Sequence, residues 1–272
     1  MKKVIFVMAM LLGYSLTLLI TPTPSFALPL GEVAIFTEQS GWIAQNTAQQ
    51  EGEELADLLK KPSKVVTLTD KEIGDWAKER TDNGLADIIV TFGWFPTNLY
   101  TPGNADPDDS VAELFLEGGN VFLNTADYIF YVTQGGGANG EQGLKNMMDI
   151  NADMWSGGSG IKPTADGKKY TPSLGNFTSE RTFKAAQIVD PWEVEAIFGD
   201  TGSGNIDPAI VHDTETGGRI GIAFQEPNNA GLPRGEVLAE MIDNFLFEVL
   251  GAQAVDPQQK ATTTWGHLKS GF

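Results

Sequence analysis

The stretch that decides the fold is Ala86-Asp-Ile-Ile-Val-Thr-Phe92, an almost continuous apolar run. Such a run is typical of a strand that is buried on both faces, because a strand with one face in water alternates polar and apolar residues. Three other segments, residues 32–37, 64–69 and 120–124, follow the same plan. We therefore predict a mainly parallel sheet that is covered by helices on both faces.

Helix signals separate these segments. Leu55 and Leu59 lie on one face at helical spacing, and Pro62 ends that helix. Asp70 is expected to cap a second helix, and Asp106 a third that ends before residue 120. Strands joined by helical crossovers predict a doubly wound, three-layer α/β sandwich of the flavodoxin type, with right-handed connections.

Residues 135–182 break this alternation, because glycine-rich segments surround a single short helix at residues 144–148. A segment of this length predicts an insertion or a loop system beside the ligand site. After it we expect a strand at 183–189, a short helix at 191–198, a C-terminal β-hairpin made of 209–212 and 219–224, and a terminal helix after residue 235.

The N-terminus has the pattern of a signal peptide. Lys2 and Lys3 precede an apolar run over residues 4–20, and Ala27 is a small residue at the expected cleavage position. We therefore expect residues 1–27 to be removed and the protein to be periplasmic or extracellular. A retained membrane anchor is the alternative, but the run is shorter than the roughly 20 apolar residues of a stable span, so no stable span is expected after cleavage.

The rest of the chain is predicted to be one α/β domain, residues 28–251, and a polar, flexible tail, residues 252–272. Trp265 and Leu268 are isolated apolar residues in that tail. A docking or sorting peptide is therefore the alternative to plain disorder there.

The composition excludes several kinds of site. The chain has 36 Asp and Glu against 18 Lys and Arg, a formal charge of -18, which disfavours nucleic acid as a partner. Without cysteine and with two histidines, it has no disulfide and no cysteine nucleophile, and we expect no metal and no cofactor. The carboxylates of Asp106, Asp108 and Asp109 lack a complete calcium loop, and Arg219 and Arg234 are predicted to be surface charges. Nothing in the composition indicates an oligomeric state.

Three segments carry a resemblance to a known family: residues 86–93 before a loop with Trp and Pro, residues 116–123 with the sequence Leu-Glu-Gly-Gly-Asn-Val-Phe-Leu, and residues 217–224 before the last helix. In this order they resemble the class I glutamine amidotransferase-like fold, nearest to its trehalose-utilisation (ThuA-like) branch, across residues 31–250. The resemblance implies a nucleophile on a sharp turn between a strand and a helix, where helix-terminal amides stabilise an anion. Asn124-Thr-Ala-Asp127 matches that turn but has no cysteine, and the histidine-bearing turn of the branch is absent. Cys-dependent glutamine hydrolysis is therefore not expected.

Thr125, Asp127 and His212 are the remaining catalytic candidates. The Thr125 hydroxyl would need a base, and His212 is the only histidine before the tail. The neighbouring Asp213 could orient its ring, although a surface histidine at a strand end is the simpler interpretation. A hydrolase with an atypical Thr/Asp/His site is therefore one alternative function.

Aromatic and amide side chains follow the carboxyl ends of the predicted strands. The candidates for ligand binding are Trp42, Trp94, Tyr100, Asn124 and Tyr128. Ligands bind at this edge of open α/β sheets, and aromatic rings beside amides suit a carbohydrate or another small polar ligand. Core packing explains each aromatic residue separately as well.

The leading hypothesis is an exported, noncatalytic, amidotransferase-like domain that binds a carbohydrate or other polar ligand through its strand-end loops. Besides the hydrolase, a surface interaction module directed by the C-terminal tail is an alternative. Aromatic faces open to solvent beside Asp127 would favour binding, whereas convergence of Thr125, Asp127 and His212 would favour an enzyme.

Overall fold

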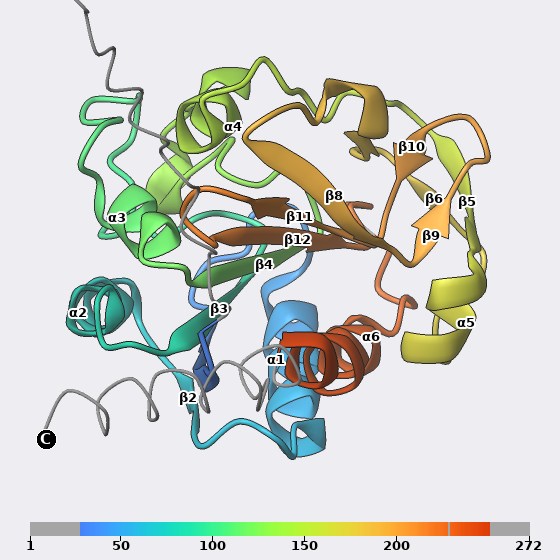
Figure 1. The fold of residues 1–272 in the computed structure, drawn as a ribbon, viewed down its shortest axis with the longest axis horizontal. Coiled ribbons are helices and arrows are strands. Elements are labelled where there is room, and N and C mark those ends of the chain that lie inside the picture. The colour runs from blue at the N-terminus through green and yellow to red at the C-terminus, as the bar shows by residue number, and fades with distance from the viewer. Residues whose placement is uncertain (1–27, 228, 251–272) are drawn as a thin grey trace, which may run out of the picture.

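The structure, a computed structural model, describes residues 28–227 and 229–250 (Figure 1). The predicted signal peptide 1–27 and the predicted tail 252–272 lie outside the described residues. The described part is an α/β structure with a seven-stranded, mostly parallel sheet and a second, five-stranded antiparallel sheet. None of its helices has the length and apolar character needed to cross a bilayer.

The seven-stranded sheet has the order β2-β1-β3-β4-β12-β11-β8. Its strands are β1 (Leu30–Phe36), β2 (Val65–Thr67), β3 (Ala86–Phe92), β4 (Val121–Thr125), β8 (Trp192–Ile197), β11 (Ala209–Asp213) and β12 (Arg219–Ala223). The first five strands in this order are mutually parallel, whereas β11 is antiparallel to both β12 and β8. Every residue of β3 is buried, so the prediction from its continuous apolar run is confirmed.

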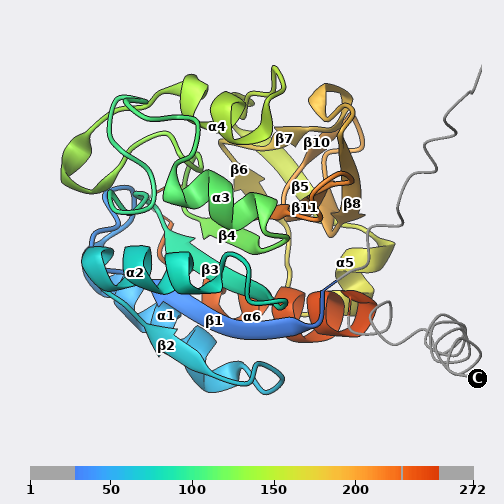
Figure 2. The ribbon, with the colours of Figure 1, turned by 60° about the vertical axis from the view of Figure 1, so that its left-hand side comes forward.

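Helices lie on both faces of this sheet (Figure 2). One face carries α2 (Asp70–Arg80), α3 (Val111–Glu117) and α4 (Glu141–Met148), and the other carries α1 (Gln45–Leu58) and α6 (Arg234–Glu240). A π-helix, η3 (Met241–Leu250), continues α6.

Two predicted helix caps are wrong by one to a few residues. Thr69, rather than Asp70, caps α2, because its side chain forms a capping box with Glu72. Ser110, rather than Asp106, caps α3, because its hydroxyl accepts the N–H at the third helical position. In both cases the N-cap hydrogen bond is accepted by a hydroxyl residue directly before the helix and not by the nearby carboxylate that was predicted to accept it.

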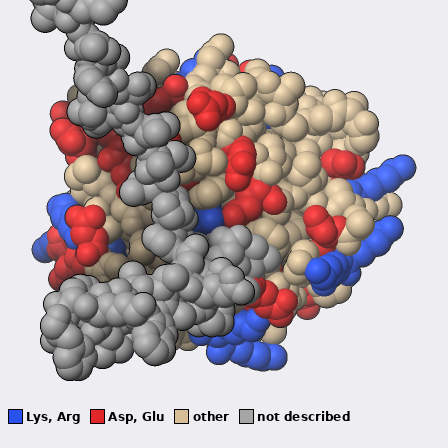
Figure 3. All heavy atoms as spheres, in the orientation of Figure 1, with Lys and Arg blue, Asp and Glu red and all other residues tan. Residues whose placement is uncertain are grey.

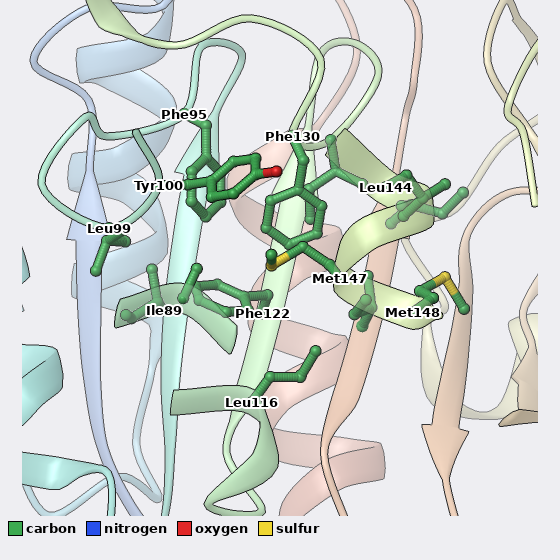
Figure 4. Packing of buried hydrophobic residues seen from close by; sticks show 14 of the residues in the cluster. Ile89, Phe95, Leu99, Tyr100, Leu116, Phe122, Phe130, Leu144, Met147 and Met148 are labelled. Carbon is green, nitrogen blue, oxygen red and sulfur yellow. The ribbon is translucent and has the colours of Figure 1, made fainter. Parts of the chain in front are cut away.

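An aromatic cluster fixes the loops that leave β3 and β4 (Figure 4). Phe122 on β4 packs against Phe95 and Phe130, with ring centroids 5.4 and 5.7 Å apart. Phe95 follows β3, Phe130 follows β4, and their own ring centroids are 4.6 Å apart. Each ring that is removed from water in this way contributes roughly 1.5–3 kcal/mol. The core therefore holds both loops in place at this end of the sheet.

Strands of a second sheet lie within residues 135–182, so the loop system predicted there is wrong, whereas the alternative prediction of an insertion is not contradicted. The strands of this sheet are β5 (Ser159–Pro163), β6 (Phe177–Ser179), β7 (Phe183–Lys184), β9 (Gly199–Asp200) and β10 (Asn205–Ile206), in the order β6-β5-β9-β10-β7, and α5 (Ala165–Tyr170) follows β5. In β5 only Ile161 is buried, so the alternating apolar pattern that indicates a strand is missing. The strand predicted at 183–189 ends at Lys184 and is followed by a 3-10 turn, Ala185–Gln187.

The short helix predicted at 191–198 is also wrong, because this segment is strand β8 at the edge of the main sheet. Trp192, Val194 and Ala196 alternate there with two glutamates, which is the period of a half-buried strand. The hairpin predicted from 209–212 and 219–224 is confirmed, since β11 and β12 pair in antiparallel register.

Candidate functional site

The carboxyl ends of β3, β4 and β12 lie side by side, and each strand is followed by a residue with positive φ. These residues are Gly93, Ala126 and Phe224, with φ of 84°, 91° and 50°. A Cβ atom on Gly93 would lie 2.0 Å from the Ser40 carbonyl oxygen, so only glycine fits there. Positive φ at Ala126 and Phe224 costs energy, and such strain is common where a fold positions a functional group.

The turn after β4 carries no nucleophile. Its sharply bent residue is Ala126, whose side chain is a methyl group, and the preceding Thr125 is fully buried. After β4 come only a 3-10 turn at Gln134–Gly136 and then α4, which begins at Glu141, so this strand does not turn directly into an α-helix. The strand-to-helix turn implied by the family resemblance is therefore not formed here.

His212 lies at the amino-terminal end of the parallel strands, whereas Thr125 lies at their carboxyl end. His212 pairs with Arg219 on β12, and Arg219 pairs with Val121 at the start of β4, whereas Thr125 ends that strand. Its Nδ1 atom lies 3.4 Å from Glu193 Oε1. The structure therefore does not bring the predicted Thr/Asp/His arrangement together.

Asp127 lies beside a group of aromatic rings at the end of β4. Its Oδ1 accepts the Tyr128 N–H at 2.6 Å and lies 3.4 Å from Arg181 Nε. The Arg181 guanidinium lies over Trp155, 4.3 Å from the ring centroid. Trp155 contacts the rings of Tyr128 and Tyr131 at centroid distances of 5.6 and 5.5 Å. We refer to these three rings as the aromatic triad; Trp155 is 39% exposed.

The site has more negative than positive charge. Burial raises the pKa of Asp127, and a backbone N–H and Arg181 offset part of this rise. Burial also raises the pKa of Glu226, as does repulsion from Glu180 and Asp127, against attraction by Arg234 and Arg181. We refer to Asp127, Glu180 and Glu226 as the carboxylate cluster. Among the described residues, no group of three His, Asp or Glu side chains is arranged to hold a metal ion.

A buried hydrogen-bond network connects the second sheet to this site. The N–H of the fully buried Gln225 donates to Asp207 Oδ2 at 2.8 Å, and the Ser179 hydroxyl donates to the same oxygen at 2.7 Å. The Gln225 carbonyl accepts the N–H groups of Glu180 and Arg181 at 2.9 and 3.2 Å. Burial raises the pKa of Asp207 to about 7. The network therefore holds Arg181 in place beside the end of β4.

Four of the predicted ligand-binding residues lie at this edge of the sheet. Tyr128 belongs to the aromatic triad, but its side chain is buried, so among Tyr128 and Trp155 it is Trp155 that is exposed to a ligand. Asn124 is fully buried at the end of β4, where its Nδ2 donates to Thr91 Oγ1 at 2.9 Å. Trp42 and Trp94 follow β1 and β3 and form an edge-to-face pair of their own, with ring centroids 6.4 Å apart.

Tyr100 does not belong to the site. Its side chain is fully buried in the core on the α2, α3 and α4 face (Figure 4). Its hydroxyl donates to Asn104 Oδ1 at 2.7 Å and accepts from Asn146 Nδ2 at 2.9 Å. Because the ring is enclosed and the hydroxyl is satisfied, Tyr100 offers no face to a ligand.

Most of the charged and aromatic side chains of the site were not predicted from the sequence. The residues not predicted are Trp155, Glu180, Arg181 and Glu226. The prediction that Arg219 and Arg234 are surface charges is wrong, because both are buried. Arg219 donates to the Glu195 carboxylate, and Arg234 donates to the carbonyls of Glu226 and Asn229 at 2.7 and 2.5 Å. The length of the segment 135–182 was the available signal, because long connections often carry function, but length does not identify side chains.

Comparison with known proteins gives no family assignment. No protein-family model matches the sequence, and no curated protein matches it either. Among solved structures, the chain is similar to a protein from Bacteroides uniformis described as ThuA-like, at 9% identity and a TM-score of 0.46, over 82% of this chain and 93% of that one. It is also similar to the protein SMU.1228c, at 7% identity and a TM-score of 0.37, over 78% of this chain and 98% of that one. At these identities and TM-scores, neither likeness assigns a function to the chain.

Proposed function

We propose that this chain is an exported, noncatalytic domain of amidotransferase-like fold that binds a carbohydrate at the carboxyl edge of its main sheet. The observation that carries the proposal is the exposure of Trp155 beside Asp127 and Arg181. The apolar C–H surface of a sugar ring packs on an indole, while carboxylate oxygens accept hydrogen bonds from its hydroxyl groups.

The absence of catalysis is proposed from the geometry of the turn after β4. Ala126 occupies the bent position, and the Thr125 hydroxyl has no hydrogen-bond partner among the described residues. His212, the base predicted from the sequence, lies at the amino-terminal end of the parallel strands, away from Thr125. A nucleophile needs an adjacent base to activate it, so these residues support binding rather than hydrolysis.

Titration calorimetry of the purified full chain against a panel of oligosaccharides tests the proposal. For a saccharide that binds, Trp155→Ala is expected to weaken binding at least about tenfold, because the stacking surface is lost. Leu114→Ala is the matched control, since Leu114 is 40% exposed and lies on α3, outside the site.

Two results would count against the proposal. If no saccharide in the panel binds, the site is not a carbohydrate site. If a saccharide binds equally well to the wild type and to Trp155→Ala, the ligand lies elsewhere, and the aromatic triad has a structural role.

A further inference from the structure

The charges and hydrogen bonds of the same site indicate which class of saccharide it prefers, so this inference rests on the proposed function. Asp127, Glu180 and Glu226 come from three separate segments, after β4, β6 and β12. Arg181 lies between two of them, 3.4 Å from Asp127 Oδ1 and 3.7 Å from Glu180 Oε2, and Glu226 follows Gln225, whose carbonyl accepts the Glu180 N–H. Glu180 forms a salt bridge with Arg181 and is the more exposed of the two, with 35% of its side chain exposed against 21% of the Arg181 side chain.

The two guanidinium groups nearby are engaged by the protein itself. Arg181 donates to the Glu180 carbonyl at 2.8 Å, pairs with Asp127 and stacks on Trp155. Arg234 is fully buried and donates to two backbone carbonyls. A charged group that already has hydrogen-bond partners inside the protein offers little to an anionic ligand.

Buried oxygen atoms beside the carboxylate cluster lack donors. Gln225 is fully buried and its Nε2 donates to the Asn124 carbonyl at 2.9 Å, which fixes the amide orientation and leaves Oε1 unpaired among the described residues. Glu226 Oε2 is likewise without a donor in that part of the chain. An unpaired buried acceptor costs about 1–3 kcal/mol, so a ligand that supplies donors is favoured.

We infer that this site binds saccharides with free amino groups in preference to neutral saccharides, and neutral saccharides in preference to uronic acids. A protonated amine brings three donors and a positive charge to the carboxylate cluster, where acceptors and negative charge are in excess. An uronic acid brings a further carboxylate to Asp127, Glu180 and Glu226, and like charges repel. A neutral sugar has the hydroxyl donors but not the charge.

Calorimetry with three oligosaccharides of equal length tests this order: oligomers of glucosamine, of N-acetylglucosamine and of galacturonic acid. At about pH 6 the amine is protonated and the uronate is ionised. The glucosamine oligomer is expected to bind the full chain about tenfold more tightly than the N-acetylated one, and the galacturonate oligomer most weakly. The first ratio should fall as the salt concentration rises, because ions screen exposed charges.

Matched substitutions separate the local cluster from the overall negative charge of the protein. Glu226→Gln is expected to reduce the preference for glucosamine over N-acetylglucosamine about threefold or more. Glu113→Gln is the control, because Glu113 also has an unpaired Oε2 and acidic neighbours, but lines a hollow with Asp213 and Glu215 at the opposite edge of the sheet. It removes the same net charge and should leave the preference unchanged.

The outcomes distinguish this inference from the proposed function. If glucosamine and N-acetylglucosamine oligomers bind equally well, or if galacturonate binds best, the charge preference is wrong while carbohydrate binding stands. If both substitutions lower the preference equally, the effect belongs to the whole molecule and not to the carboxylate cluster, which also overturns the inference. If none of the three saccharides binds, the inference is overturned, and the wider panel decides separately whether the proposed function stands.

Discussion

Asp207 is a carboxyl group that folding removes from water. Its Oδ2 accepts the Ser179 hydroxyl and the Gln225 N–H, but burial outweighs these bonds and raises its pKa from 3.8 to about 7. The folded protein therefore binds this proton more tightly than the unfolded chain. The resulting stabilisation is present in full below about pH 4 and is lost as the pH rises through about 7.

Asp207→Asn should flatten this dependence, because the amide stays neutral at every pH. We expect the variant to be more stable than the wild type above about pH 7. Between about pH 4 and pH 7, its free energy of unfolding, measured in urea, should change by a few kcal/mol less than that of the wild type. Asp190→Asn is the control, because Asp190 also precedes a proline but is exposed. If both variants keep the wild-type profile, Asp207 is ionised in the folded protein over this range.

Single residues of the site were predictable only where a local pattern marked them. Asp127 and Tyr128 follow an apolar strand, so the rule that ligands bind at strand ends finds them. Trp155 and Arg181 lie in segments without a regular apolar period, and contacts between distant parts of the chain bring them to β4. No local pattern records such contacts, and for the same reason the burial of Arg234 was not foreseen.

The turn after β3 depends on a missing side chain. Gly93 has φ of 84°, and a Cβ there would lie 2.0 Å from the Ser40 carbonyl oxygen. Gly103 has a similar φ of 77°, but no atom lies within 4 Å of its added Cβ. The pair separates the cost of backbone conformation from the cost of a steric clash.

Gly103→Ala is expected to lower the free energy of unfolding by about 1 kcal/mol, since positive φ disfavours a Cβ. Gly93→Ala should lower it by at least about 3 kcal/mol, because the 40–43 segment must move as well. Urea unfolding followed by tryptophan fluorescence measures both, and Trp42 and Trp94 report on the displaced segment. If both variants lose the same free energy of unfolding, the close contact with the Ser40 carbonyl does not add to the cost of the substitution.

At the level of elements, predictability follows the regularity of the apolar pattern. The continuous run of β3 and the β11–β12 hairpin are found because their residues alternate or cluster as strands require. Strand β8 has that alternation too, and the helix prediction overlooked it. The strands of the second sheet are two to five residues long, too short for a period to emerge.

The surface charge of the whole molecule acts on any ligand that approaches it. On the face shown in Figure 3, acidic side chains are spread over the surface and lysine and arginine lie mainly near its margins. With a formal charge of -18 for the chain, anionic ligands meet an unfavourable field before they reach the site. This is why the Glu113 control is needed beside Glu226.

Export is also a property of the whole chain. If residues 1–27 are a signal peptide, N-terminal sequencing of the exported protein should begin at Leu28. Leu12→Arg should abolish export, because a charge in the middle of the apolar run prevents its recognition. An exported protein that retains Met1 would show that the segment is an anchor, and normal export of the variant would show that the run has no targeting role.

The link through Gln225 has a consequence for protein engineering. The Gln225 carbonyl accepts the N–H groups of residues 180 and 181, and its N–H donates to Asp207. The smaller sheet therefore cannot be deleted without changing the site. A shortened chain without residues 155–187 would keep every strand of the main sheet, yet it would lose the indole of Trp155 and the guanidinium of Arg181 together. Grafting the site onto another scaffold would therefore require both sheets, not a transplanted loop.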